Sequence, residues 1–353
     1  ESQSVIEEAL CNEPAGIYAQ MDFHTRDRYR HVIERIAVRT GKDELDIANL
    51  AIELASQHQD QEESDESADL RRSHVGFYLI GPGKRVLESR AGYTAPWPQR
   101  LGRALRRAAP VLYLLAISLS AMAISLGLVV NFAPRLGTRW GGIILTVLLV
   151  LLVATKPILS IINWLATLLV RPRGLPRLDF HKGIPDEHRT LVAIPTLITS
   201  NRVVDDLVRH LEIRFLANRD RNLLFALVTD YADADSQHTP ADEKILEHAK
   251  ACITHLNERY AMDGREMFYL IHRQRQWNEC EGKWMGRERK RGKVSDLNRL
   301  ILGQSVPDMN VVVGDASLLQ TVQYVISLDS DTQLPPQAAW RMVGTLAHPL
   351  NRP

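Results

Sequence analysis

The sequence predicts a Rossmann-like α/β domain over residues 171–353, preceded by two transmembrane helices and a small, mainly helical domain. Three observations lead to this prediction. Short apolar runs alternate with amphipathic segments after Thr190, which is typical of an α/β domain with a largely parallel sheet. No charged residue lies between Ala108 and Pro134, and apolar residues between Phe23 and Ser56 recur at helical spacing.

The composition supports folded domains and argues against one class of partner. With 353 residues, 45% of them hydrophobic, the chain can bury substantial cores. Lys and Arg number 43 against 42 Asp and Glu, and a net charge of +1 does not predict a nucleic-acid-binding protein. Cys11, Cys252 and Cys280 are widely spaced and lack a CxxC motif, so we interpret them as reduced, structural thiols in the cytoplasm. The chain starts at Glu1 without a signal sequence, and we expect a piece of a longer protein.

Residues 1–107 are expected to form the helical domain on the cytoplasmic side of a membrane. Within it, Gln57–Asp69 is acidic and free of aromatic residues, which favours a solvated linker or helix surface. The segment His74–Glu88 is a short apolar run with a Pro-Gly turn, which predicts a short hairpin. Gly81–Lys84 is not interpreted as a phosphate loop, because it lacks the GxxxxGK[ST] spacing and a following helix.

The two transmembrane segments are predicted within residues 108–170. Val111–Phe132 is long enough to span a hydrocarbon core of ~30 Å. The second apolar stretch, Trp140–Val170, contains Lys156 and Pro157, so we expect a span that ends near Lys156 and then an interfacial segment. Buried core helices are the alternative interpretation.

Arginine residues predict the topology of this membrane segment. They crowd both outer flanks and are sparse in the intervening loop, so the positive-inside rule predicts a multi-pass protein of the inner (cytoplasmic) membrane with both flanks in the cytoplasm. The flanking residues are Arg100, Arg103, Arg106, Arg107, Arg171, Arg173 and Arg177, and those of the loop are Arg135 and Arg139.

In the α/β domain, ligands are expected beyond the carboxyl ends of the strands, as in other open α/β sheets. The residues that follow each strand are therefore the candidate site. The expected strands are Leu191–Ile194, Leu223–Thr229, Phe268–His272 and Tyr324–Leu328, and the expected helices are Val203–Asn218, Asp242–Tyr260, Val294–Leu302 and Gln337–Ala347.

The last of these strands leads directly into Asp329-Ser330-Asp331. An extended backbone places alternate side chains on one side, so Asp329 and Asp331 are expected to share one divalent cation. Carboxylate oxygens suit Mg²⁺ or Mn²⁺, and either ion would neutralise the charge of a diphosphate. A polar turn without function is the alternative, because Asp and Ser are common turn residues.

A second acidic strand end is predicted at Asp230, with Asp233 and Asp235 after it. A carboxylate there can accept a hydrogen bond from a uracil N–H. Between the two acidic strand ends, Trp284–Lys293 carries five basic residues and precedes a predicted helix, a position that suits a diphosphate. Solvated surface loops are the alternative for both segments, and the basic run also suits anionic lipid.

The order of four motifs resembles the nucleotide-binding half of family-2-like glycosyltransferases of the GT-A fold. This resemblance implies that Asp230 contacts the uridine, that Lys293 and its neighbours contact the diphosphate, and that Asp329 and Asp331 bind the donor and a metal ion. The motifs are Ile194-Pro195-Thr196, Thr229-Asp230, Gly292-Lys293 with Leu297-Asn298, and Leu328-Asp329-Ser330-Asp331.

Longer phrases are similar to cyclic β-1,2-glucan synthases over nearly the whole chain. This resemblance implies a membrane enzyme that transfers glucose from UDP-glucose, with inversion and with Mg²⁺ or Mn²⁺, to a β-1,2-glucan primed on the protein. It implies UDP-glucose, the glucan acceptor and membrane lipid as partners, and no nucleic acid. The phrases are PAGIYAQMDF from Pro14, TRDRYR from Thr25, FYLI from Phe77, AIPTLITS from Ala193, HLEIRFLANRD from His210, WMGRERKRGK from Trp284 and TLAHPLNRP from Thr345.

The catalytic base is not assigned. Inverting enzymes need a carboxylate that deprotonates the acceptor, which this resemblance places in a TED-like motif before a QxxRW-like motif. Neither motif occurs by Pro353, so we expect the base beyond it and expect this part to bind donor without polymerising glucose. Two alternatives stay open: another membrane β-glucan or lipid-linked sugar transferase, and a non-catalytic membrane scaffold. The residues left without a role are Trp277, Trp284, Trp340, His181, His272 and His348.

Overall fold

The computed structural model describes residues 5–57, 70–132, 140–170, 172 and 174–352. The chain divides into two compact units. One comprises residues 1–37, 43–87 and 176–353, and contains the amino-terminal helices and the α/β part. The other comprises residues 38–42 and 88–175 and contains two long helices.

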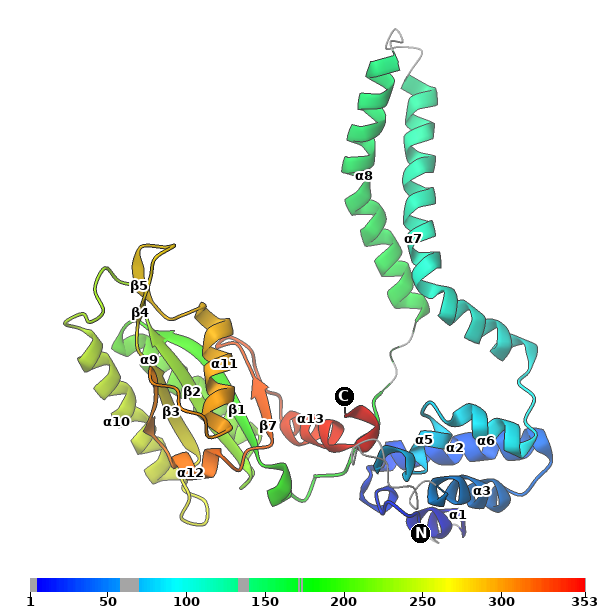
Figure 1. The fold of residues 1–353 in the computed structure, drawn as a ribbon, viewed down its shortest axis with the longest axis horizontal. Helices are drawn as coiled ribbons and strands as arrows, with labels where there is room; N and C mark the ends of the chain where they lie inside the picture. The colour runs from blue at the N-terminus through cyan, green and yellow to red at the C-terminus, as the bar shows by residue number, and fades with distance from the viewer. Residues whose placement is uncertain (1–4, 58–69, 133–139, 171, 173, 353) are drawn as a thin grey trace. The chain divides into compact units, whose positions relative to one another are not determined.

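The α/β part is built on a five-stranded sheet with the order β6-β3-β2-β1-β7 (Figure 1). Four strands are parallel, and β6 is antiparallel to β3. Every residue of β2 is buried, which explains why it reads as a continuous apolar run rather than an alternating one. The strands are β1 (Thr190–Ile198), β2 (Leu223–Tyr231), β3 (Phe268–Arg273), β6 (Met309–Val313) and β7 (Tyr324–Ser327), and a separate two-stranded ribbon pairs β4 (Gln276–Asn278) with β5 (Lys283–Met285).

Helices follow the parallel strands as the crossover connections of such a sheet require. Ser200 begins the first of them, because its hydroxyl accepts a hydrogen bond from the Val203 backbone N–H. The helices are α9 (Asn201–Ala217), α10 (Asp242–Tyr260), α11 (Arg289–Ile301), α12 (Ala316–Leu319) and α13 (Ala338–Ala347), with the 3₁₀ turns η3 (Asp186–His188) and η4 (Pro349–Asn351).

The predicted α/β domain with a parallel-rich sheet is confirmed, and the prediction for α10 matches at both ends. Two bounds that matter for the site differ. β2 extends through Tyr231, so Asp230 lies inside the strand rather than after it. α11 begins at Arg289 instead of Val294, so the basic residues form its first turn. The short elements β4, β5, β6 and α12 were not predicted.

The amino-terminal part is helical, as predicted, but the predicted hairpin is wrong. Two short helices occupy that segment, α5 (Gly76–Leu79) and α6 (Lys84–Ala91). A short apolar run has no periodicity that distinguishes a strand from a helix, so the conformation of this segment depends on its packing. A Cβ on Gly76 would lie 2.1 Å from the Tyr29 hydroxyl, so this helix approaches its neighbour closely. A helix does follow Gly81–Lys84, so only the missing GxxxxGK spacing still argues against a phosphate loop. The other helices of this part are α1 (Val5–Cys11), η1 (Tyr18–Gln20), α2 (Phe23–Thr40) and α3 (Glu44–Ser56).

A buried polar chain ties these helices together. The Glu13 carboxylate lies 2.9 Å from His74 Nδ1 and accepts a hydrogen bond from the Val75 N–H at 2.7 Å. His74 Nε2 lies 3.0 Å from the Tyr29 hydroxyl, and burial raises the pKa of Tyr29 well above its usual value. The carboxy-terminal segment joins this core through His348, whose ring is 5.2 Å from that of His74.

The second unit is dominated by α7 (Trp97–Phe132) and α8 (Trp140–Leu169), which run side by side in Figure 1. The hydroxyl of Tyr113 in α7 donates a hydrogen bond of 2.9 Å to Asn163 Oδ1 in α8. Near the start of α7, Arg103 binds both carboxylate oxygens of Glu88 at 2.8 and 3.0 Å.

Among the described residues, one helical stretch is long and apolar enough to cross a membrane, Trp97–Gly127. The apolar stretch identified in α8, Thr155–Leu169, is shorter. Of the two predicted transmembrane helices, the one in α7 is therefore supported and the one in α8 is not. α8 continues through Pro157 as one helix, and the expected end of the span near Lys156 stays a prediction. Some sequence predictions lie outside the described residues, namely those for most of the acidic tract and for Arg135, Arg139, Arg171 and Arg173.

Candidate functional site

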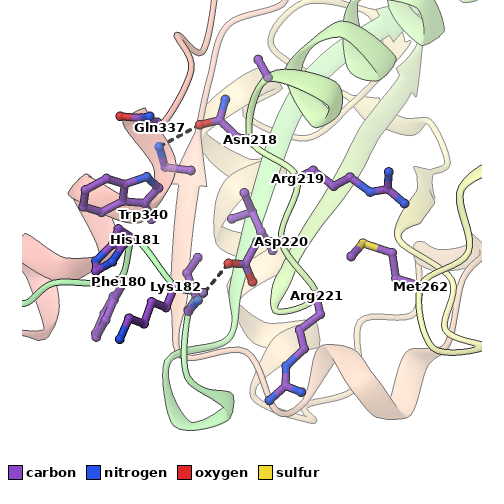
Figure 2. Close-up of a pocket in the computed structure, with 15 residues that line it drawn as sticks. Phe180, His181, Lys182, Asn218, Arg219, Asp220, Arg221, Met262, Gln337 and Trp340 are labelled. Carbon is purple, nitrogen blue, oxygen red and sulfur yellow. Dashed lines mark hydrogen bonds between the residues drawn. The ribbon is translucent and has the colours of Figure 1, made fainter.

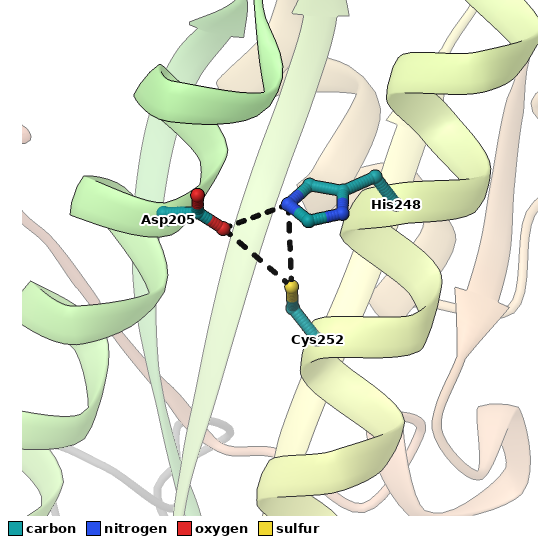
Figure 3. Close-up of side chains that lie close together, drawn as sticks. All are labelled: Asp205, His248 and Cys252. Carbon is teal, nitrogen blue, oxygen red and sulfur yellow. Dashed lines mark hydrogen bonds and ion pairs between the residues drawn. The ribbon is translucent and has the colours of Figure 1, made fainter.

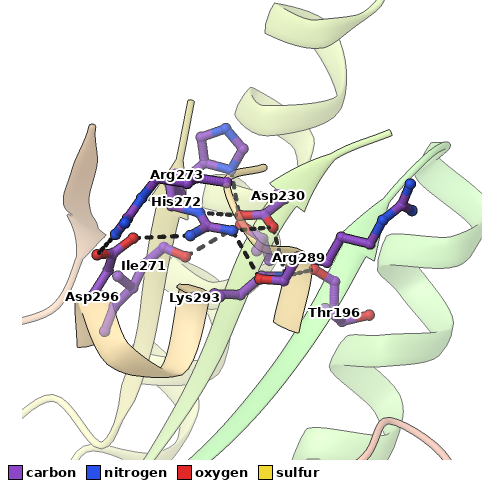
Figure 4. A network of polar contacts seen from close by, with 10 residues as sticks. Thr196, Asp230, Ile271, His272, Arg273, Arg289, Lys293 and Asp296 are labelled. Carbon is purple, nitrogen blue, oxygen red and sulfur yellow. Dashed lines mark hydrogen bonds and ion pairs between the residues drawn. The ribbon is translucent and has the colours of Figure 1, made fainter. Parts of the chain in front are cut away.

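Asp230 lies near the carboxyl end of β2 and is buried, with 1% of its surface exposed. The parallel register pairs it with Arg273 at the end of β3, and the two side chains form a bidentate ion pair (Figure 4). Arg273 Nε and Nη2 donate to the two Asp230 oxygens, each at 3.0 Å. Burial acts to lower the pKa of Arg273, but its hydrogen bonds to Asp230 and Asp296 outweigh burial and raise it.

Lys293 of α11 joins the same cluster. Its ammonium lies 3.2 Å from Asp230 Oδ2 and donates to the backbone carbonyl of Thr196 in β1. The side chain is 3% exposed, and burial lowers the pKa of Lys293 although Asp230 opposes that effect. The structure therefore brings together two sequence-predicted site residues, Asp230 and Lys293, with the strand that carries Thr196.

A second buried acid completes this cluster. Asp296 of α11 accepts from Arg273 Nη1 at 2.9 Å and from the partly exposed Arg287 at 2.8 Å. Asp230, Asp296, Arg273 and Lys293 are all nearly inaccessible to solvent, and their two negative and two positive charges balance. We call these four residues the buried cluster. Its balanced charge means that it does not by itself attract an anion.

Gly286 covers the buried cluster closely. A Cβ on this residue would lie 2.4 Å from Asp230 Oδ2 and 2.8 Å from Arg273 Nη2. Only glycine lets the backbone approach the ion pair so closely. The turn at Gly286 therefore separates Asp230 from solvent.

The start of α11 supplies exposed positive charge beside the buried cluster. Its first turn carries Arg289, Lys290 and Arg291, all with more than half of the side chain exposed, and no acidic residue. Helices prefer acidic residues at this end, because the free backbone N–H groups carry partial positive charge. Glu288 and Arg289 also adopt positive φ angles of 49° and 48°. A helix start of this kind attracts an anion.

Asp329 and Asp331 lie in a turn and not on an extended strand. β7 ends at Ser327, and the Thr332 N–H donates 3.0 Å to the Asp329 carbonyl. The prediction that an extended backbone aligns the two carboxylates is therefore wrong, because the chain bends at this point. Both residues are exposed, and Lys290 from α11 forms an ion pair with Asp329. The structure thus joins the turn to the basic helix start.

Arg214 of α9 binds the backbone of this turn. Its guanidinium donates to the Ser330 carbonyl at 2.6 Å and to the Thr332 carbonyl at 2.8 and 3.0 Å. The residue is 5% exposed, and burial lowers the pKa of Arg214 while nearby Asp331 opposes that effect. One turn further on, Asn218 donates 3.1 Å to the Leu334 carbonyl. The end of α9 therefore fixes the backbone of the turn without binding its carboxylates.

The residues of the turn fit a hard divalent cation. Asp329 and Asp331 offer exposed carboxylate oxygens, the ligand type that Mg²⁺ and Mn²⁺ prefer. Two protein carboxylates are the usual share for Mg²⁺ when a substrate phosphate and water supply the other ligands.

Sequence reasoning missed Arg273, Asp296 and Arg214. Arg273 could have been suspected, because it directly follows the apolar run of β3 and thus ends a buried strand. His272 was left without a role, and it is buried with Nδ1 2.9 Å from the Thr229 hydroxyl. Burial, and next the charge of Lys293, lower the pKa of His272 to about 4.

A hollow of about 650 Å³ lies at the opposite, amino ends of the strands (Figure 2). It is lined by the segments that precede β1 and β2 and by the start of α13, including Phe180, Asp220 and Trp340. None of Asp230, Lys293, Asp329 and Asp331 lines it.

Comparisons with known proteins give one informative match. No known protein-family profile matches the chain. The cyclic β-(1,2)-glucan synthase NdvB of Rhizobium meliloti (strain 1021) is 39% identical over 342 residues, which cover 95% of this chain. The chain spans about 12% of the length of that relative. The resemblance seen in the sequence is therefore confirmed, and this chain is a homologue of a segment of a cyclic β-1,2-glucan synthase.

Proposed function

We propose that this chain carries the donor-binding half of a glycosyltransferase that transfers glucose from UDP-glucose to a growing β-1,2-glucan. The observation that carries the proposal is the convergence of three segments at the carboxyl edge of the sheet: the buried cluster, the basic start of α11 and the acidic turn after β7. Open α/β sheets bind ligands at this edge. The homologue is a cyclic β-(1,2)-glucan synthase, which supports a β-1,2-glucan as the product.

The diphosphate is placed at the start of α11. The first turn offers backbone N–H groups and three exposed cations, each of which now pairs with an exposed or partly exposed carboxylate that a phosphate can replace. Lys293, held by Asp230, fixes this helix against the carbonyl of Thr196 in β1. Lys290 lies beside Asp329, so its ammonium reaches phosphate oxygens bound near that carboxylate.

Asp329 and Asp331 are the residues that would hold Mg²⁺ or Mn²⁺, which would neutralise charge on the departing UDP. The transfer is an inverting displacement. The acceptor 2-hydroxyl oxygen bonds to the anomeric carbon, the bond from that carbon to UDP breaks, and the hydroxyl proton passes to a carboxylate base outside the assigned residues. Arg214 keeps the backbone of the turn in place, and the carboxylates of Asp329 and Asp331 remain positioned to bind the ion.

Asp230 is proposed as the uridine contact. Its oxygens retain acceptor capacity beyond the bonds to Arg273 and Lys293, since a carboxylate has about four lone-pair sites. Contact with uracil requires the turn at Gly286 to move, because that turn covers Asp230. The buried cluster is thus both a support for α11 and the floor of the uridine site.

The proposed location is the inner membrane, with the amino-terminal and transferase parts in the cytoplasm. Trp97–Gly127 supports membrane insertion, and the arginines before the apolar core of α7 support a cytoplasmic start. Protease protection in inside-out vesicles tests the side of the membrane. Protection of the segment after Val170 would contradict the proposal.

Donor binding tests the site directly. UDP-glucose should bind the detergent-purified chain in the presence of Mn²⁺, and Asp331→Ala should abolish the metal-dependent part of the affinity. Asp206→Ala is the matched control, since Asp206 is an exposed aspartate of α9 that pairs with Arg209 of the same helix. Metal-dependent binding that survives in Asp331→Ala would refute the metal assignment.

Product analysis separates the proposed reaction from other sugar transfers. In the longer enzyme that contains this segment, Asp329→Ala and Asp331→Ala should abolish incorporation of glucose from UDP-glucose. Linkage analysis of the wild-type product should give 1,2-linked glucose, and its NMR spectrum should show the inverted, β configuration at the anomeric carbon. Another linkage would identify a different β-glucan transferase, and the absence of metal-dependent donor binding would identify a scaffold.

A further inference from the structure

A second cluster of metal-ligating side chains lies away from the carboxyl edge, on the helices α9 and α10 (Figure 3). Asp205 comes from α9, and His248 and Cys252 come from α10. His248 Nε2 lies 2.7 Å from Asp205 Oδ1 and 3.7 Å from Cys252 Sγ. Cys252 Sγ lies 3.9 Å from the same Asp205 oxygen. Among the described residues, this is the one group of three or more such ligands that converges.

We propose that Asp205, His248 and Cys252 bind one zinc-class divalent cation in a three-ligand site that joins α9 to α10. Zinc bonds of about 2.3 Å to sulfur and about 2.0 Å to nitrogen, at a tetrahedral angle, place those two atoms roughly 3.6 Å apart. The observed separation of Sγ and Nε2 is 3.7 Å. The two ligands of α10 are thus already spaced for one ion.

The ligand types select the class of metal. A thiolate and an imidazole favour zinc, cobalt or copper over magnesium and calcium. The acidic turn after β7 offers only carboxylates, so the two sites are expected to bind different ions. Three protein ligands leave the fourth tetrahedral position to water, which is accessible because Asp205 and His248 are partly exposed.

The helix geometry explains how the three ligands meet. His248 and Cys252 are four residues apart, which places them on one face of α10 in successive turns. α10 packs against α9, and Asp205 lies on the turn that faces them. An ordinary Asp–His ion pair would need only Asp205 and His248, whereas here the thiol also points at both partners.

Metal binding must displace the thiol proton. A cysteine thiol is ordinarily protonated near neutral pH, so Cys252 must lose its proton when an ion binds. A dication reverses this preference, because it stabilises the thiolate directly and neutralises Asp205. No redox change is involved: the sulfur–hydrogen bond breaks, the proton leaves to solvent and the sulfur–metal bond forms.

Cobalt(II) is the probe that tests this site. The complete chain, purified in detergent under reducing conditions with excess Mg²⁺, should bind one equivalent of Co²⁺ and show a thiolate-to-cobalt charge-transfer band. The band should be lost in Cys252→Ala and retained in Cys280→Ala, which removes an exposed thiol elsewhere. Zn²⁺ should displace the cobalt and bleach the band.

Two further variants keep the test decisive if Cys252→Ala folds poorly. Asp205→Asn removes the carboxylate but preserves size, and it should weaken Co²⁺ binding at least about tenfold. His255→Ala changes an exposed histidine of the same helix and should leave binding unchanged. Equal cobalt affinity in Asp205→Asn and wild type, or a wild-type complex without a thiolate band, would overturn the proposal.

Discussion

Two acidic sites at the same edge of the sheet are built in opposite ways. Asp230 is buried, and cations from β3 and α11 bind its oxygens directly. Asp329 and Asp331 are exposed, and Arg214 holds them through the backbone of their turn, while the exposed Lys290 pairs with Asp329. In the first arrangement the carboxylate is bound inside the protein, whereas in the second both carboxylates reach solvent, and the exposed Lys290 is the cation beside Asp329.

This difference predicts which acidic residues can be substituted without unfolding the domain. Removing one member of a buried, balanced cluster leaves an uncompensated charge in a region of low dielectric. Removing an exposed carboxylate has no such effect, because water already solvates it. We therefore expect the free energy of unfolding to separate the two sites sharply.

The largest effect is expected for Asp230→Asn. Without its negative charge, Arg273 and Lys293 stay buried with only Asp296 to balance them, and the free energy of unfolding should fall by about 3–5 kcal/mol. Denaturant unfolding in detergent measures this. Asp233→Asn is the control, because Asp233 pairs with the exposed Arg289, and this substitution should change the free energy of unfolding by less than about 1 kcal/mol. Equal losses in both variants would contradict the contrast between buried and exposed acids.

The next effect concerns pH and His272, which lies beside the buried cluster. Its pKa is lowered to about 4, so between about pH 6.5 and pH 4 the unfolded chain binds a proton that the folded chain does not. The free energy of unfolding should therefore fall as the pH falls through this window, by up to about 3 kcal/mol from this group. Unfolding of wild type and His272→Gln at several pH values isolates the contribution. Parallel pH profiles would show that His272 titrates normally.

A smaller effect is expected for Arg214→Met, which removes the support of the acidic turn. Several hydrogen bonds from a charged donor to backbone carbonyls are lost, and stability should fall by about 2–3 kcal/mol. The affinity for Mn²⁺ should fall as well, since the carboxylates lose their alignment. Arg214→Lys keeps the charge and should recover part of the metal affinity. Loss of stability with an unchanged affinity for Mn²⁺ would mark Arg214 as purely structural.

The smallest effect on stability is expected for Asp331→Ala. The side chain is exposed, so the free energy of unfolding should change by no more than about 0.5 kcal/mol. Metal-dependent donor binding should nevertheless disappear, because a ligand is gone. Thermal unfolding and UDP-glucose titration on the same sample check both statements. A stability loss as large as that of Asp230→Asn would mean that the turn is part of the core.

Much of the fold follows from local patterns in the sequence. The parallel strands are continuous apolar runs, and α10 is amphipathic between clear ends, so both were predicted. The segment at Gly76–Leu79 was not, because a short apolar run has no period of its own and the contact with Tyr29 decides its conformation. The same limit hid the three-residue strands β4 and β5.

The sequence by itself determined which residues of the site carry charge and that they lie at or near the carboxyl ends of the strands of one sheet. Only the tertiary structure decided which of them are neighbours. Arg273 meets Asp230 because the parallel register of β2 and β3 places them side by side, although 43 positions separate them in the chain. Arg214 meets the turn at Ser330 across 116 positions. Such partners depend on how helices and strands pack, and spacing along the chain carries no record of that packing.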